Sequence, residues 1–426
     1  MNSTYLAQTL GLASAAILAT TGPASAQQAP PPPRPSQASR QAPAQRPTMM
    51  PRIPSLPVGA SQPGGPLPGL TQTELANFGA GLDEFENAET PAGGLGPIFN
   101  DVSCVSCHNA GGTGGGSTVN VTRFGLRDAN GFDPLEDLGG SLLQRQAIAP
   151  GAREIVPGQA NVIAMRQSTP LFGLGLIEAI PDAAILENAK RPPVNGIRGR
   201  ANQITDVVSG QVRTGRFGWK AQQATILAFS ADAYVNEMGV TNRFFSKENA
   251  PNGDPDLLAK FDAVADPEDT VDPATGKADI DASADFMRFL APPQPLPLSP
   301  SAIAGRGLFT SALTDCAVCH KPSMTTGPSP VAALSKKPVN LYSDLLVHDM
   351  GSLGDGITQG NVRGNEMRTA PLWGLRLSAP YLHDGRAPGI DAAIRAHDGE
   401  AAVSREKYLR LSPVQRQQMI DFLRSL

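Results

Sequence analysis

The placement of the cysteines limits what this chain can fold into more than any other feature. The sequence of 426 residues contains four cysteines, and all of them lie in two copies of the pattern Cys-x-x-Cys-His. This pattern is the attachment signal of a c-type haem, because both thiols bond to the porphyrin and the next histidine binds the iron. A redox dithiol does not need that histidine, and a zinc site would need the two distant motifs to converge. We therefore predict two covalently bound haem c groups, one on Cys104, Cys107 and His108 and one on Cys316, Cys319 and His320.

The first 26 residues have the pattern of a secretory signal peptide. A largely apolar stretch, Leu12 to Ala19, precedes the small-residue cleavage pattern that ends at Ala26. The stretch is shorter than the roughly 18 residues that a membrane span needs. Bacteria attach c-type haem outside the cytoplasmic membrane, so the two signals agree, and we expect a periplasmic protein.

The remaining chain is expected to form a linker and two domains. Residues 27–69 are rich in proline and contain no acidic residue, which predicts a disordered linker. Helical patterns then occur in both halves of the chain. They are expected to begin after Thr71, with Glu74 completing a capping box, at 182–190, 220–234, 282–290 and 301–309, and after Ser412 with Pro413 in its first turn.

These patterns predict a mainly α fold with two tandem cytochrome c-like haem domains and long loops. The N-terminal haem domain would span residues 70–291 and the C-terminal haem domain residues 292–426. Residues 249–280, rich in Asp, Pro and Gly, are expected to form a surface insertion.

The histidines are distributed unevenly. Apart from the two motifs, the chain has His348, His383 and His397, and all three follow the second motif. The C-terminal haem therefore has histidine candidates for a second ligand, whereas the N-terminal haem would take a methionine, such as Met165 or Met238, or a weaker ligand, or stay open. An open iron can react with peroxide or dioxygen, whereas a saturated one only relays electrons. Two functions remain: an oxidoreductase with one reactive haem, and a non-enzymatic di-haem electron-transfer cytochrome.

Several segments resemble a known family. The stretches 342–351, 368–375 and 379–386 resemble the C-terminal domain of bacterial di-haem cytochrome c peroxidases. Residues 170–182 and 215–239 are more similar to the related di-haem oxidoreductase family, which is also labelled thiol oxidoreductase. The resemblance covers roughly residues 70–426.

The resemblance implies roles for individual residues. His397 would be the second ligand of the C-terminal haem, Trp219 would lie between the haems, and Glu237 would transfer protons beside the N-terminal haem. A calcium ion would bind between the domains to the backbone oxygens of Ser378 and Pro380. Core packing is the alternative role for Trp219, and a surface carboxylate is the alternative for Glu237.

Four further side chains are interpreted as structural neighbours of the haem. We expect His383 to form a hydrogen-bonded pair with Asp384, and His348 to bind a propionate or the backbone. Arg368 and Arg386 are expected to pair with propionates.

Together these observations predict a periplasmic, peroxidase-like di-haem oxidoreductase. The peroxidases carry a histidine in their N-terminal domain that binds the resting haem, and this chain has none there, so an accessible N-terminal haem is expected. Its partners would be a redox protein that donates or accepts electrons and a small-molecule oxidant, and related peroxidases suggest a homodimer. The net charge of -4 gives no basic surface for nucleic acid. No cysteine is left over for thiol chemistry.

Overall fold

The structure is a computed structural model. It describes residues 62–262, 264, 269–273 and 275–426. The predicted signal peptide, residues 1–26, and residues 27–61 of the predicted linker lie outside the described residues. Both haem motifs belong to one compact unit of the described residues. Within it, Leu67 is already buried against the fold.

Helix α1 (Gln72–Glu86) forms where the sequence predicts it. Thr71 and Glu74 make the predicted capping box, which satisfies free backbone N–H groups at the start of the helix. Helix α7 (Asp279–Phe289) confirms the helix expected at 282–290.

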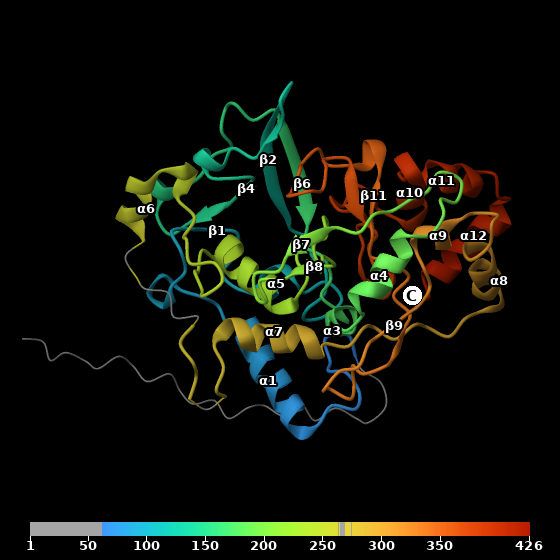
Figure 1. The fold of residues 1–426 in the computed structure, drawn as a ribbon, viewed down its shortest axis with the longest axis horizontal. Coiled ribbons are helices and arrows are strands. Elements are labelled where there is room, and N and C mark those ends of the chain that lie inside the picture. The colour runs from blue at the N-terminus through green and yellow to red at the C-terminus, as the bar shows by residue number, and fades with distance from the viewer. Residues whose placement is uncertain (1–61, 263, 265–268, 274) are drawn as a thin grey trace, which may run out of the picture. The chain divides into compact units, whose positions relative to one another are not determined.

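Helices α1 and α7 pack closely against each other (Figure 1), and α1 also contacts the helix of the first haem motif. The Phe85 and Phe286 rings lie 4.6 Å apart, and the Phe78 and Phe286 rings lie 5.3 Å apart. The two helices can approach this closely because α1 has a glycine at the crossing: a Cβ on Gly81 would lie 2.2 Å from the Ala282 carbonyl oxygen.

Helix α5 (Ile226–Ala233) is shorter than predicted and continues into one π-helical turn, Tyr234–Met238. The prediction of helix from residue 220 is wrong. The backbone reverses there, with Ala221 at a φ of 51°, and the Thr225 side chain caps the helix instead. A π turn is rare and is found mostly at functional sites.

The fold contains a sheet that the sequence analysis did not predict. Four antiparallel strands form it: β2 (Asn120–Asp128), β3 (Gly131–Asp133), β4 (Leu142–Leu143) and β6 (Val162–Gln167). Strands β2 and β6 lie side by side and project from the helices (Figure 1). The mainly α prediction therefore holds only in part, although twelve α-helices remain the main elements of the described residues.

The C-terminal part is helical around the second motif. Its helices are α8 (Pro300–Phe309), α9 (Cys316–Cys319), α10 (Ile390–Arg395), α11 (Ala402–Leu409) and α12 (Pro413–Leu423). Helices α8 and α12 pack against each other around Phe309 and Phe422, whose rings lie 5.3 Å apart. The predicted N-cap Ser412 and the first-turn Pro413 are both confirmed.

The other elements are short. The helices are α2 (Cys104–Cys107), α3 (Leu174–Glu178), α4 (Asp182–Ala189), which confirms the helix predicted at 182–190, and α6 (Pro255–Phe261) within the predicted insertion. The strand pairs are β1 (Ile98–Phe99) with β5 (Gln146–Ala147), β7 (Gln203–Thr205) with β8 (Val212–Thr214), β9 (Met324–Thr325) with β10 (Pro338–Val339), and β11 (Val347–Asp349) with β12 (Glu366–Arg368).

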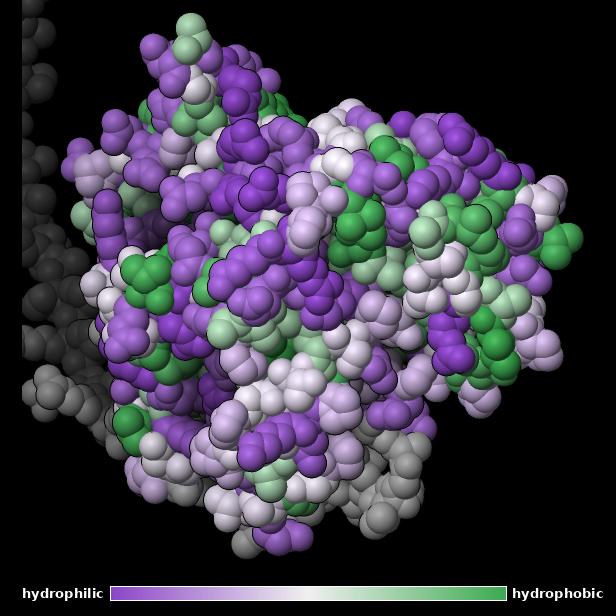
Figure 2. Space-filling view, turned by 45° about the vertical axis from the view of Figure 1, so that its right-hand side comes forward, coloured by the Kyte–Doolittle hydropathy of each residue, from purple (hydrophilic) through white to green (hydrophobic). Residues whose placement is uncertain are grey.

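The largest hydrophobic cluster crosses the domain boundary that the sequence suggested at residue 292. It joins Phe78 and Ile177 to Leu341 and Leu346. On the face that Figure 2 shows, hydrophobic residues are interspersed with hydrophilic ones, as is ordinary for a folded protein. Among the described helices, none has the length and apolar character needed to cross a lipid bilayer.

Candidate functional site: two cavities that share a tryptophan

The first motif lines a cavity of about 150 Å³, here called the N-terminal cavity. Cys104, Cys107 and His108 all face it. His108 Nδ1 lies 3.2 Å from the Gly115 carbonyl oxygen. A carbonyl can only accept a hydrogen bond, so Nδ1 carries the proton and Nε2 keeps a free lone pair. Burial lowers the pKa of His108 to about 4, which also keeps the ring neutral. His108 therefore fits the role of an iron ligand.

The second motif lines a larger, mostly apolar cavity of about 260 Å³, here called the C-terminal cavity. Cys316, Cys319, His320 and His397 all line it. The rings of the two histidines have centroids 6.4 Å apart. Two imidazoles that bind one metal from opposite sides, each at about 2.0–2.1 Å, place their ring centres roughly 6 Å apart. The pair therefore fits a haem iron between them.

Backbone carbonyls orient both of these histidines. His320 Nδ1 lies 3.0 Å from the Tyr342 oxygen, and His397 Nδ1 lies 2.8 Å from the Ala393 oxygen. Each ring therefore holds its proton on Nδ1, as His108 does, and keeps Nε2 available for a metal.

His348 also lines the C-terminal cavity, but both of its nitrogens are in use. Nδ1 lies 2.8 Å from Glu400 Oε2, and Nε2 lies 3.0 Å from Asp344 Oδ2. Burial opposes the charged ring, but hydrogen bonds to Asp344, Cys319 and Glu400 raise the pKa of His348 well above its usual value. The expected propionate or backbone partner is therefore wrong, because the partners are two carboxylates.

His383 differs from its expected role in a similar way. Its Nε2 lies 3.9 Å from Asp384 Oδ2, which is too long for the predicted hydrogen bond. Asp384 instead forms an ion pair with Arg386 at 2.5 Å. Arg386 is not among the residues that line the cavity, so a role beside a propionate is not supported for it, whereas Arg368 does line the cavity.

Trp219 lines both cavities. Its indole Nε1 donates a hydrogen bond to the Gln167 carbonyl oxygen at 2.7 Å. The edge of its ring meets His383, with centroids 6.2 Å apart. The side chain is therefore fixed in position where the two cavities meet.

Three carboxylates line the N-terminal cavity, Asp101, Asp232 and Glu237, and the last two come from the segment of α5 and its π turn. Glu237 lies in the π turn, and its Oε2 accepts a hydrogen bond from Asn100 Nδ2 at 2.8 Å. Asp232 lies five residues earlier, in α5 just before the π turn, and also lines the cavity. Burial raises the pKa of Glu237, with Arg123 and Asn100 acting in the opposite direction, and burial raises the pKa of Asp232 to about 6.

Two arginines from the unpredicted sheet complete the polar lining. Arg123 on β2 and Arg166 on β6 lie on one face, because the register pairs Val121 with Arg166 and Arg123 with Ala164. Sequence reasoning missed both arginines because it missed the sheet. It also missed Asp232, since nothing in the sequence signals a π turn.

The methionines of this half fall into two groups. Met238 is buried and lines the N-terminal cavity, as does Met287 of α7, which the sequence analysis did not consider. Met165 is 43% exposed and lies outside the residues that line the cavity. Met238 and Met287 are therefore the methionines placed to reach a haem there.

Solved structures that are similar to this chain include hydrazine synthase of Kuenenia stuttgartiensis (14% identity, 88% of this chain and 98% of that chain, TM-score 0.39), a MauG-like protein associated with microbial copper homeostasis (16%, 87% and 94%, 0.38), and the diheme peroxidase BthA of Burkholderia thailandensis (13%, 61% and 78%, 0.31). These TM-scores are too low to support a functional argument. Among curated proteins, none matches this chain significantly. Residues 158–426, more than half of the chain, match the family described as "Di-haem oxidoreductase, putative peroxidase", and the chain belongs to this family.

Proposed function

We propose that this protein is a periplasmic, peroxidase-like oxidoreductase with two covalently attached haem c groups in tandem cytochrome c-like domains. The observation that carries the proposal is the inequality of the two cavities. His397 faces His320 in the C-terminal cavity. The five histidines of the chain leave none to face His108 in the N-terminal cavity, where Glu237 and Asp232 lie instead.

The lining residues fit covalent attachment. In each cavity the two cysteines lie one helical turn apart and the following histidine is held by a backbone carbonyl. Bound there, the haems supply iron centres that exchange electrons and, where a coordination position is open, activate peroxide or dioxygen.

Glu237 is proposed to move the proton in the N-terminal cavity. Its raised pKa lets it hold a proton closer to neutral pH than an exposed glutamate does. Asn100 fixes one carboxylate oxygen, so the other can face the cavity. Arg123 lies near enough to stabilise the carboxylate after the proton has left.

The C-terminal cavity is proposed to serve electron transfer. His320 and His397 each keep Nε2 free and would together hold the iron of the C-terminal haem, which would then exchange electrons without binding a substrate. Trp219, which lines both cavities, would carry electrons between them. A redox protein is the proposed partner on this side, and the homodimer expected from related peroxidases is proposed with it.

A non-enzymatic electron-transfer cytochrome is the second candidate. Met238 and Met287 both line the N-terminal cavity, and a methionine sulfur there could saturate the first iron. The resting EPR spectrum of the ferric protein separates the two functions. The proposed oxidoreductase predicts a high-spin component beside a low-spin one, whereas a wholly low-spin spectrum would support the electron carrier.

A calcium ion is also proposed near Ser378 and Pro380, on the strength of the family resemblance. Calcium takes oxygen ligands. Asn120 lies beside the same loop, since its Nδ2 donates to the Asp384 carbonyl oxygen at 3.4 Å, and its buried Oδ1 has no hydrogen-bond partner. Among the described residues, acidic side chains do not gather into a metal-binding cluster, so backbone and amide oxygens would hold the ion. Chelation should lower the unfolding temperature of the wild-type protein but not of Asn120→Ala, and an unchanged wild-type temperature would contradict the site.

A further inference from the structure

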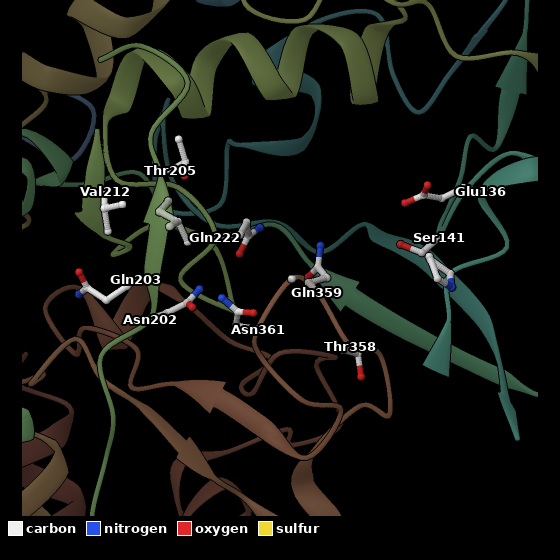
Figure 3. A pocket seen from close by; sticks show the side chains of 13 residues that line it. Glu136, Ser141, Asn202, Gln203, Thr205, Val212, Gln222, Thr358, Gln359 and Asn361 are labelled. Carbon is white, nitrogen blue, oxygen red and sulfur yellow. The ribbon is translucent and has the colours of Figure 1, made fainter. Parts of the chain in front are cut away.

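A second, polar hollow lies beside the N-terminal cavity and is not part of it. This cleft has a volume of about 550 Å³ and lies between the β7–β8 hairpin, the loop 358–361 and the segment 134–141 (Figure 3). Neutral amide and hydroxyl side chains dominate its lining, and Glu136 is its one charged residue. The neutral polar residues are Asn202, Gln203, Gln222, Gln359, Asn361, Ser141, Thr205 and Thr358.

One layer of side chains separates the cleft from the N-terminal cavity. Gln222 lines both hollows, and its Oε1 accepts a hydrogen bond from the Lys220 backbone N–H at 3.2 Å. The two arginines of the cavity form hydrogen bonds with residues that line the cleft. Arg123 donates to Ser141 Oγ at 3.2 Å, and Arg166 donates to Gln359 Oε1 at 2.5 Å, so hydrogen-bonded pairs of side chains, one from each lining, separate the two hollows.

Buried polar atoms without partners lie on both sides of this wall. Arg123 Nε on the cavity side has no hydrogen-bond partner. Asn202 on the cleft side is 3% exposed and donates Nδ2 to the Ala221 carbonyl oxygen at 3.0 Å, while its Oδ1 also has no partner. A buried polar atom is unfavourable unless something binds it. The donor Arg123 Nε lies on the cavity side and the acceptor Asn202 Oδ1 on the cleft side. A molecule that both accepts and donates hydrogen bonds can bind to either of them.

We propose that the cleft is the entry route by which hydrogen peroxide, a small uncharged hydrogen-bonding oxidant, reaches the N-terminal cavity, with Gln222 as the side chain that moves aside. This inference rests on the proposed function. Amides and hydroxyls can pass such a molecule along, and the lining has no cation that would draw in anions. Rotation of Gln222 would join the two hollows without any backbone movement, because its side chain forms part of both linings.

The test measures how fast a small neutral ligand enters the intact di-haem protein. Stopped-flow spectroscopy at neutral pH gives the association and dissociation rates of hydrogen cyanide at the N-terminal haem. Val212, 68% exposed and part of the lining, is replaced by tryptophan to fill the cleft. Val207→Trp is the matched control, because Val207 is 43% exposed, lies in the turn of the same β7–β8 hairpin and is not part of the lining.

A substitution that alters an entry route changes the association and dissociation rates of the ligand by the same factor, so its Kd stays the same. Val212→Trp should slow association and dissociation by about tenfold each with an unchanged Kd, Gln222→Ala should accelerate both, and Val207→Trp should match the wild type. An unchanged association rate in Val212→Trp, or a changed Kd at an unchanged association rate, would overturn the route. If the wild-type protein binds no cyanide at all, both the proposed function and the route fail. If the wild type binds cyanide and Val212→Trp binds it equally fast, only the route fails.

Discussion

The imidazole rings of His320 and His397 face each other across the C-terminal cavity with their centroids 6.4 Å apart, and each Nδ1 is held by a backbone carbonyl oxygen. Both rings therefore keep Nε2 free for one iron. The N-terminal cavity has no such pair, since His108 is the only histidine that lines it. This difference between two otherwise similar haem sites is the basis of the predictions below.

Replacing His397 should open the C-terminal iron without releasing the haem. His397→Ala leaves Cys316, Cys319 and His320 intact, so the protein should keep two haems and convert one low-spin EPR signal to high spin. His383→Ala is the control, because His383 lines the same cavity, but it is the ring of His397 that faces His320. A low-spin signal that survives His397→Ala would remove His397 as the ligand.

Removing the proton-carrying group should slow peroxide turnover. Glu237→Gln keeps the size and the Asn100 contact but cannot transfer a proton, and general acid–base groups contribute about 10²–10⁴-fold to rate. We expect a loss in this range in kcat/KM for peroxide with unchanged haem spectra. Glu136→Gln, in the neighbouring cleft, should have a far smaller effect. Equal rates for wild type and Glu237→Gln would exclude Glu237 from the chemistry.

Trp219 should matter for electron transfer between the haems. Trp219→Phe keeps an aromatic ring but loses the hydrogen bond to the Gln167 carbonyl and the redox-active indole. Flash reduction of one haem, followed optically, should show slower equilibration with the other. Trp373→Phe is a matched control, because the second tryptophan of the chain packs on the hydrophobic core and does not line both cavities. An unchanged equilibration rate in Trp219→Phe would indicate that the residue only packs.

The buried carboxylate of Glu366, which pairs with the more exposed Arg200 and Arg363, predicts a pH-dependent stability. Burial alone would raise the pKa of Glu366, but hydrogen bonds from Arg200 and Arg363 lower it to about 2. Because the folded pKa lies below the unfolded value of about 4.3, the stabilisation is present above that value and is lost as pH falls from about 4 to 2.

The corresponding experiment compares Glu366→Gln with the wild type. The variant should lower the free energy of unfolding by about 1–3 kcal/mol at neutral pH, and the difference should shrink below pH about 4. Glu406→Gln, which removes an exposed glutamate, should be nearly neutral at both pH values. Chemical denaturation monitored by circular dichroism measures both variants, and a pH-independent difference would argue against the ion pair as its cause.

Local patterns were enough to predict a large part of the structure. The capping residues Thr71 and Ser412 and the helix at 182–190 depend on neighbours within one or two turns, and each was found. The position of His397 opposite His320 followed from the family resemblance, and the geometry supports it.

The unpredicted features depend on contacts between distant segments. The β2–β6 register joins residues about 40 positions apart, and its alternation is obscured by Arg123 and Gly125 within β2. Arg166 therefore could not be assigned to the N-terminal cavity from sequence. Asp232 lies in α5 just before the π turn that carries Glu237, and that turn was not predicted.

The stoichiometry of cyanide binding tests the inequality of the two haems most directly. Ferric protein containing two haems is titrated with cyanide and followed by optical and EPR spectroscopy. We predict that one cyanide binds per two haems, that the high-spin signal disappears and that the low-spin signal of the His320–His397 site stays unchanged. Binding of two cyanides, or of none, would contradict the account.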